Sequence, residues 1–159
     1  MIRGFLILSA VLWFTACGPS VRFRASHPGT EEQPLRAGLT DLNSFVNEWI
    51  GTPYLYGGTD RNGIDCSGFT SAVYHAVYHI TLPRQSEDQY SAGKRITESS
   101  MKPGDLVFFR GVRGPGIDHV GVYLGDGQFA HAATSTGVTI SEFSEEYYRI
   151  RFAGARRYF

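Results

Sequence analysis

The chain has 159 residues, of which 42% are hydrophobic and 14% aromatic, so it can form one packed domain and little else. Fifteen basic residues balance fifteen acidic ones, and the net charge at pH 7 is zero. Proteins that bind nucleic acid through its phosphates usually carry a basic excess or stripe, so this composition argues against a nucleic-acid partner.

The N-terminus combines a basic residue with an apolar run. Arg3 is followed by GFLILSAVLWFTA, which is shorter than the roughly 20 residues of a membrane-spanning helix but typical of a secretory signal. Because the run ends in Thr-Ala-Cys, it resembles a bacterial lipoprotein signal. The resemblance implies a signal peptide over residues 1–16 and a lipidated, palmitate-bearing Cys17. An ordinary secretory signal with an incidental Cys17 is the alternative.

The residues after Cys17 predict a tethered domain. Gly18 stands where aspartate would retain a lipoprotein at the inner membrane, which implies an outer-membrane anchor facing the periplasm. Residues 17–38 mix Pro, Gly, Ser and both charges without an apolar period, which predicts a flexible tether. The folded domain is then expected over residues 39–159, and we expect it to act as a monomer.

The first predicted helix covers residues 42–50, where apolar residues follow the spacing of an amphipathic helix. Thr40 or Asp41 can cap its start, and Gly51 ends it. Ser-Glu-Asp-Gln at residues 86–89 is a capping box that predicts another short helix, ending near Gly93.

Between these two, a helix is predicted to begin at Cys66, with Asp65 as its N-cap. Its apolar face would consist of Phe69, Ala72, Val73, Ala76, Val77 and Ile80. Arg84, which follows this helix, is interpreted as an anchor for the loop before the next one.

From residue 105 onward the apolar period changes to that of strands. Segments 105–110, 119–125, 127–133 and 137–143 are short, rich in Val, Phe and Tyr, and separated by Gly or Asp turns. They predict consecutive antiparallel strands, and residues 151–159 could supply one more. Helices followed by strands indicate an α+β domain with the helices packed on one side of a sheet.

Cys66 is the first candidate for chemistry. If Cys17 is acylated, the chain can form no intramolecular disulfide, since it holds only these two cysteines. Such a thiol in an exported protein indicates a reactive site or an intermolecular bridge. The first turn of a helix favours the thiolate, which is the nucleophile, and Gly68 would leave space above the sulfur. A small buried core cysteine is the alternative.

Two histidines lie in neighbouring predicted strands. If the turn between them has three residues, 125–127, the residue numbers of each cross-strand pair add up to 252. His119 and His131 then project from one face of the sheet. Gly121 then lies opposite His131 and leaves room for its ring. A two-residue turn would place the histidines on opposite faces. If Cys66 is left out of account, both histidines could be surface residues, or core residues whose ring nitrogens are satisfied by hydrogen bonds.

Together, Cys66, His119 and His131 form a set of nucleophile, base and orienting residue. The same three could bind zinc, but no CxxC or HExxH pattern exists, and we expect no metal or cofactor. His75 and His79 are four apart on the second helix, and we interpret them as structural.

Five motifs carry a family resemblance: YLYGGTDRNGIDCSGF, LPRQSEDQ, KPGDLVFF, HVGVYLGDGQFAHAA and the lipoprotein leader. In this order they resemble the NlpC-type family of papain-like cell-wall peptidases, over essentially all of residues 39–159. The resemblance implies an α+β papain-like fold and hydrolysis of the peptide stems of peptidoglycan.

By motif position, the resemblance makes Cys66 the nucleophile, His119 the base and His131 the third, orienting residue. It also implies that Tyr56 binds or polarises the scissile carbonyl. Asp65 and Ser67 flank the nucleophile, where some family members contact the substrate.

We expect cleavage of the γ-D-glutamyl–meso-diaminopimelate bond, by a cysteine peptidase that meets its peptidoglycan substrate while anchored to the membrane by lipid. Three alternatives stay open. The enzyme could cleave the diaminopimelate–D-alanine crosslink as a D,D-endopeptidase, or transfer the acyl group from the same thioester. The chain could also be a non-catalytic lipoprotein that binds the wall or partner proteins.

Overall fold

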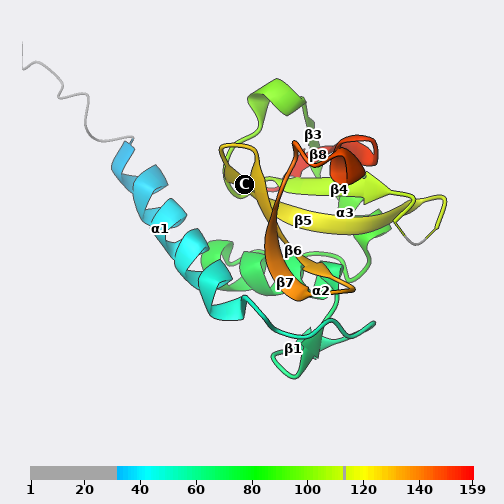
Figure 1. Ribbon diagram of the computed structural model, residues 1–159. Coiled ribbons are helices and arrows are strands. Elements are labelled where there is room, and N and C mark those ends of the chain that lie inside the picture. Colours follow the sequence, from blue (N-terminus) through cyan, green and yellow to red (C-terminus); the bar gives the residue numbers. More distant parts are fainter. Residues whose placement is uncertain (1–31, 113) are drawn as a thin grey trace, which may run out of the picture.

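A computed structural model describes residues 32–112 and 114–159 (Figure 1). The helical segments are α1 (Glu32–Trp49), α2 (Cys66–Val73), the π-helical turn η1 (Tyr74–Tyr78), α3 (Ser86–Ala92), the 3-10 turn η2 (Glu98–Ser100) and α4 (Glu146–Arg149). The strands are β1 (Thr59–Asp60), β2 (Gly63–Ile64), β3 (Lys94–Ile96), β4 (Leu106–Arg110), β5 (Ile117–Gly125), β6 (Gln128–Ala133), β7 (Gly137–Glu142) and β8 (Phe152–Arg157).

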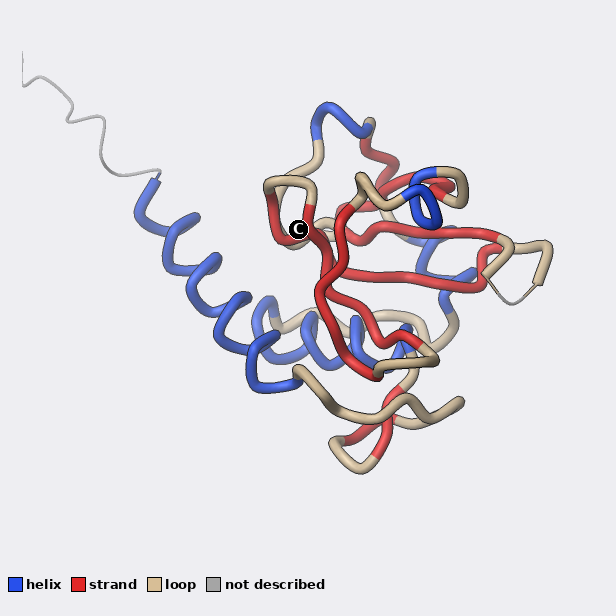
Figure 2. The backbone as a smooth tube through the Cα atoms, viewed as in Figure 1, coloured by secondary structure: helices blue, strands red, loops and turns tan. Residues whose placement is uncertain are grey.

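Six strands form one antiparallel sheet in the order β3-β8-β4-β5-β6-β7, which curves around the helices (Figure 2). The predicted strands from residue 105 to 143 are confirmed, and the last residues supply β8. This strand lies inside the sheet, between β3 and β4, where it closes what would be an exposed edge. The expected α+β class is confirmed.

Alternate residues of the sheet build two separate cores, because successive side chains of a strand point to opposite faces. Phe108 of β4 packs with Leu42 of α1 and Phe69 of α2 in the larger core. Phe109, the next residue, packs in a second core of mostly aromatic residues, and Tyr148 of α4 covers it. The helices therefore do not all lie on one side of the sheet, since α4 belongs to the second core.

The first helix begins at Glu32 and not at the predicted caps, residues 40–41. Proline is tolerated in the first helical turn, where Pro34 lies, because its missing N–H would have no intrahelical partner there. Leu35 and Leu39 extend the apolar spacing of the later residues toward the N-terminus. A helix thus replaces the predicted tether over residues 32–38.

The predicted signal peptide, the lipidated Cys17 and the tether up to residue 31 lie outside the described residues. Within the part of the chain that the structure describes, no helix has both the length and the apolar character needed to cross a membrane.

The second helix departs from its predicted apolar face. After Val73 it widens into the π-helical turn η1, which ends at His79 in a left-handed conformation with φ of 58°. A π turn holds more residues than an α turn, so the following side chains are rotated. Tyr74 is therefore fully buried, with its hydroxyl donating to the Gly104 carbonyl at 2.5 Å, while Ala76 is exposed.

The third helix ends before Gly93 as predicted, but it lacks the predicted capping box. The Ser86 hydroxyl donates to the Ile117 carbonyl oxygen at 3.3 Å instead of capping the helix. The Gln89 side chain is fully buried and reaches α2, where it accepts from the Thr70 hydroxyl at 2.9 Å. Both side chains join α3 to neighbouring elements, so tertiary contacts replace the local cap.

Candidate active site

Cys66 is the first residue of α2, as predicted, and its side chain is 1% exposed. Asp65 is the N-cap, in extended conformation, and its carboxylate accepts a hydrogen bond from the Gly68 N–H at 2.7 Å. The start of a helix carries partial positive charge from its N–H groups, and α2 places this charge at the Cys66 thiol. The local sequence therefore supplies both the position and the electrostatic setting of a nucleophile.

The Asp65 carboxylate holds the start of α2 in place. It accepts hydrogen bonds from the backbone of Gly57 and Gly68, from the Ser67 hydroxyl and from two nitrogens of Arg84. Burial raises the pKa of this carboxyl, but the bonds from Arg84, Gly68 and Gly57 outweigh burial and hold the pKa below its ordinary value of 3.8. Asp65 is therefore an ionised structural clamp beside the nucleophile.

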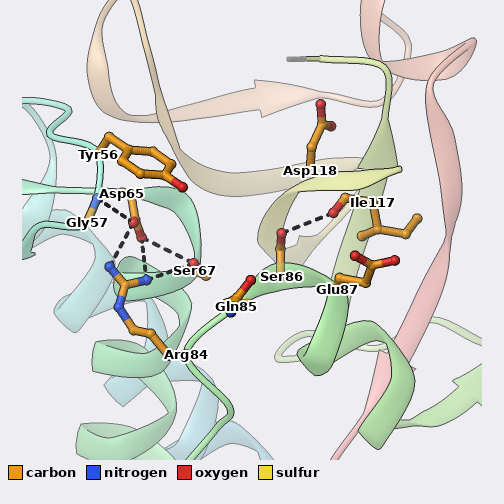
Figure 3. A pocket seen from close by; sticks show the side chains of 10 residues that line it. All are labelled: Tyr56, Gly57, Asp65, Ser67, Arg84, Gln85, Ser86, Glu87, Ile117 and Asp118. Carbon is orange, nitrogen blue, oxygen red and sulfur yellow. Dashed lines mark hydrogen bonds and ion pairs between the residues drawn. The ribbon is translucent and has the colours of Figure 1, made fainter. Parts of the chain in front are cut away.

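Arg84 connects the loop before α3 to the nucleophile helix, which agrees with its interpretation as an anchor. Its guanidinium meets Asp65 Oδ2 at 2.7 Å and also donates to the Ser67 hydroxyl at 3.0 Å (Figure 3). A third bond goes to the Gly58 carbonyl at 3.3 Å. That same carbonyl explains Gly68: a Cβ there would lie 2.6 Å from the Gly58 oxygen. The glycine permits this backbone approach, which is a different role from the predicted space above the sulfur.

His119 of β5 and His131 of β6 contact one another directly. His119 Nε2 lies 2.9 Å from His131 Nδ1, and the two rings are perpendicular. The structure contains the cross-strand pairs Val122–Ala130 and Tyr123–Phe129, whose residue numbers add up to 252 as predicted. The predicted common face of the two histidines is thus confirmed.

The turn that produces this register differs from the predicted one. Gly125 pairs with Gln128, so the turn itself has only two residues, Asp126 and Gly127, both with positive φ. The pairing shifts by one position between Tyr123 and Gly125. This bulge restores the parity that a two-residue turn would otherwise have reversed.

His131 is almost completely buried, with 1% of its surface exposed. Phe129 stacks on its ring, and Tyr148 packs against it edge to face. Burial lowers the pKa of His131 from 6.5 to about 4, because a charged imidazolium is poorly solvated in this setting. At neutral pH the ring is therefore uncharged, and one of its nitrogens is free to accept a hydrogen bond.

The buried neutral His131 predicts a dependence of stability on pH. Its folded-state pKa of about 4 lies below the ordinary 6.5, so the unfolded chain binds the proton first as the pH falls. The contribution of neutral His131 to the free energy of unfolding is fully present above pH 6.5 and is lost as the pH falls toward 4. Between pH 7 and 4, the free energy of unfolding should fall by about 3 kcal/mol more in the wild type than in His131→Asn.

Guanidinium titrations at several pH values measure this difference. His79→Asn is the matched control, because His79 is exposed and asparagine tolerates its left-handed backbone. The control should follow the wild-type curve. Parallel curves for the wild type and His131→Asn would contradict a neutral buried His131.

A cavity of about 450 Å³ lies between the start of α2 and the start of β5 (Figure 3). Asp65 and Ser67 line it from beside Cys66, and Ile117 and Asp118 line it from just before His119. Tyr56, whose side chain is 81% exposed, projects over its opening. The structure thus brings all the residues predicted for substrate binding to one cavity.

Two further cavities continue the first. One of about 450 Å³ shares Tyr56 and Asp118 with it, and another of about 270 Å³, lined by His119 and His131, is joined to the second through Thr134. The three form a groove that passes the catalytic candidates. Because the groove runs from Asp65 and Ser67 to the two histidines, it suits a substrate that continues beyond the bond to be cleaved.

Several residues of this region were not predicted. Tyr148 and Ser141 contact His131, and the Asp118 carboxylate accepts from the backbone of Val112 and Gly114 in the loop before β5. Tyr148 lies on α4, which at four residues is too short for an apolar period to reveal. Asp118 directly precedes the predicted base, and that position was the only signal in the sequence.

His75 lies on η1, and His79 follows its last residue. Both are exposed and lie away from this groove, which agrees with their interpretation as structural residues. Across the described residues, no group of three or more His, Cys, Asp or Glu side chains is arranged to hold a metal ion.

The chain is similar to bacterial endopeptidases. A probable endopeptidase NlpC homolog of Haemophilus influenzae is 47% identical over 116 residues, which cover 73% of this chain and 61% of that protein. The murein DD-endopeptidase MepS/murein LD-carboxypeptidase of Escherichia coli K12 is 33% identical over 175 residues, covering 99% of this chain and 92% of that protein.

A crystal structure of an NlpC/P60 family protein from Bacillus cereus superposes with a TM-score of 0.69 at 36% identity, covering 76% of this chain and 40% of that one. The sequence profile of the NlpC/P60 family matches residues 51–157, from the end of α1 to the last strand. This match spans Cys66, both histidines of the candidate site and the whole six-stranded sheet, and it shows that the chain belongs to the NlpC/P60 family.

Proposed function

We propose that the protein is a peptidoglycan endopeptidase of the cysteine type, which hydrolyses an amide bond of the peptide stem. One observation carries the proposal: a hydrogen-bonded pair of histidines and the two residues that flank the Cys66 thiol at its helix start line one continuous groove. A thiol, a base and a neutral orienting group are the components that thioester chemistry requires. Membership of a peptidase family supports this assignment.

In the proposed mechanism, His119 takes the proton of the Cys66 thiol, and the thiolate attacks the carbonyl carbon of the stem amide. The Cys66 backbone N–H, at the positive end of α2, stabilises the oxyanion, together with the hydroxyl of Tyr56. Protonated His119 gives its proton to the leaving amine as the C–N bond breaks. Water, deprotonated by His119, then hydrolyses the thioester and restores the thiol.

The bond we propose is γ-D-glutamyl–meso-diaminopimelate, one of the amide bonds of the peptide stem. A second candidate is the D,D-crosslink between diaminopimelate and D-alanine. The Escherichia coli K12 relative, whose alignment covers 99% of this chain, is named a murein DD-endopeptidase. This name favours the second bond. The groove runs from the residues that flank Cys66 to the two histidines, and this length is compatible with either substrate.

We also propose that the enzyme works in the bacterial cell envelope, held by a lipid on Cys17 to the outer membrane and facing the periplasm. The leader sequence supports this location. An anchor confines the enzyme near the wall and raises the local concentration of its substrate.

Digestion of purified sacculi tests the function and the bond together. Mass spectrometry of the products should show stems shortened after D-glutamate if the first bond is cleaved, and resolved crosslinks if the second is cleaved. A product that carries a new amine or alcohol would indicate acyl transfer instead. Release of identical products by the wild type and by Cys66→Ala would leave the non-catalytic alternative.

A further inference from the structure

His131 makes hydrogen bonds through both of its ring nitrogens. Nδ1 faces His119 Nε2 at 2.9 Å. Nε2, on the other side of the ring, lies 3.1 Å from the Ser141 hydroxyl and 3.3 Å from the Tyr148 hydroxyl. The mechanism above uses only the first of these contacts, so the two hydroxyls have no role in it.

We propose that Ser141 and Tyr148 are positioning residues that hold His131 in the tautomer with its proton on Nε2. In this tautomer the lone pair of Nδ1 accepts a hydrogen bond from the Nε2–H of His119. The proposal rests on the proposed function, because it assigns the two hydroxyls a task in activating the base.

The assignment of the tautomer follows from counting protons. His131 is neutral at neutral pH, so only one of its nitrogens carries hydrogen. His119 can take a proton from the thiol only through Nδ1, and its own hydrogen must therefore lie on Nε2. That hydrogen needs an acceptor, and the nitrogen that faces it is His131 Nδ1. The hydrogen of His131 must then lie on Nε2, where it requires an acceptor of its own.

The two hydroxyls supply that acceptor. Burial raises the pKa of the Tyr148 phenol above its ordinary value. A hydrogen bond with Ser141 lowers this pKa but does not outweigh burial. Tyr148 thus keeps its proton at neutral pH. When Ser141 gives its single hydrogen to the Tyr148 oxygen, its own oxygen has only lone pairs left for His131. The opposite tautomer of His131 would make His119 point an N–H at the thiol, and His119 could not act as a base.

The fold fixes both hydroxyls independently of one another. Ser141 pairs with Phe129 across β6 and β7, which places its side chain on the same face as His131. Tyr148 comes from α4 and is held by ring contacts with Phe129 at 4.9 Å and His131 at 5.3 Å. The one-turn helix that covers the second core thus also carries one of the two groups that face the histidine.

The tautomer can be read directly by NMR on the full-length protein labelled with ¹⁵N-histidine. Two-bond ¹H–¹⁵N correlations distinguish a protonated ring nitrogen from an unprotonated one. The wild type should show His131 with its hydrogen on Nε2. In Ser141→Ala/Tyr148→Phe, the hydrogen should be redistributed between the two nitrogens. A wild-type His131 with its hydrogen on Nδ1 would overturn the proposal.

Kinetics with a soluble muropeptide provide the second readout. The double variant should lose about 10- to 100-fold in kcat with little change in KM, because an outer partner of a catalytic histidine is removed without touching the substrate. Ser141→Thr keeps a hydroxyl at this position. The variant Ser141→Thr/Tyr148→Phe should therefore be as active as Tyr148→Phe alone. Tyr123→Phe/Ser144→Ala removes one tyrosine and one serine hydroxyl elsewhere and should keep wild-type kinetics.

A double variant with wild-type kcat and an unchanged His131 tautomer would refute the positioning role. Thermal unfolding of each variant separates this outcome from loss of the fold. The NMR experiment needs no substrate, so it tests the tautomer even if the enzyme proves inactive on peptidoglycan. Failure of the proposed function and failure of this inference are therefore distinguishable.

Discussion

Replacement of Cys66 by alanine should reduce hydrolysis of a soluble muropeptide by at least about 10⁴-fold, because it removes the proposed nucleophile. The fold should survive, since the change deletes one sulfur from a small buried side chain at a cost of about 1 kcal/mol. Steady-state kinetics followed by chromatography measure the first effect, and thermal unfolding measures the second. Loss of activity without loss of structure is what distinguishes a nucleophile from a core cysteine.

Three further variants sharpen the test. His119→Ala should lose nearly as much activity, and the double variant with Cys66→Ala should lose little more, because the residues of a catalytic unit are not additive. Cys17→Ala removes the other cysteine and should leave hydrolysis of the soluble substrate unchanged. If Cys66→Ala kept more than a few per cent of the wild-type rate, Cys66 would not be the nucleophile.

The elements of the site that depend on local sequence could be predicted. Asp65 caps α2 and Cys66 begins it because a short acceptor at the N-cap satisfies N–H groups only three residues away. The two histidines fall on one face because strand residues alternate and the hairpin pairs near neighbours in sequence. Such arguments need no knowledge of the rest of the fold.

Prediction failed where distant contacts override a local preference. Ser86 and Gln89 have the spacing of a capping box, yet the free energy gained by joining α3 to β5 and α2 is evidently larger. The π turn at Tyr74 likewise serves a bond to Gly104, thirty residues further along the chain. No local pattern announces either contact.

The hairpin shows that a correct conclusion can rest on the wrong geometry. A two-residue turn at Asp126 and Gly127 should have separated the histidines, and only the bulge before it reunites them. Glycine at position 125, with φ of 102°, is the residue that permits this bulge. The sequence predicts glycine-rich turns here, but it does not distinguish a three-residue turn from a two-residue turn with a bulge.

Replacement of Arg84 by methionine should lower the free energy of unfolding by about 2 kcal/mol, because it removes the cationic partner of the buried Asp65 carboxylate, and solvent around the 44% exposed Arg84 side chain limits the loss. Methionine keeps much of the apolar length of the side chain, so the loss reports the charge. The same change should reduce kcat, since Asp65 holds the first turn of α2 and with it Cys66. Urea titration and muropeptide kinetics on one preparation measure both effects.

The pH dependence of this loss has a definite sign. In the wild type the folded pKa of Asp65 lies below 3.8, so its ionisation contributes stability that is present above that pH and lost below it. Burial raises the pKa of Asp65, and without Arg84 the strongest opposing hydrogen bond is lost, so the pKa rises relative to the wild type. The difference in stability between the wild type and Arg84→Met should therefore shrink as the pH is lowered toward 3.

Two matched variants decide whether the charge is the cause. Asp65→Asn/Arg84→Met removes both charges but keeps an N-cap that accepts from Gly68, so it should recover much of the stability lost in the single variant. Arg61→Met breaks a pair with Glu48 in which both side chains are more than half exposed, and it should cost no more than about 1 kcal/mol. If Arg84→Met and Arg61→Met were equally stable, Asp65 would need no cationic partner. The start of the nucleophile helix would then be held by backbone hydrogen bonds alone.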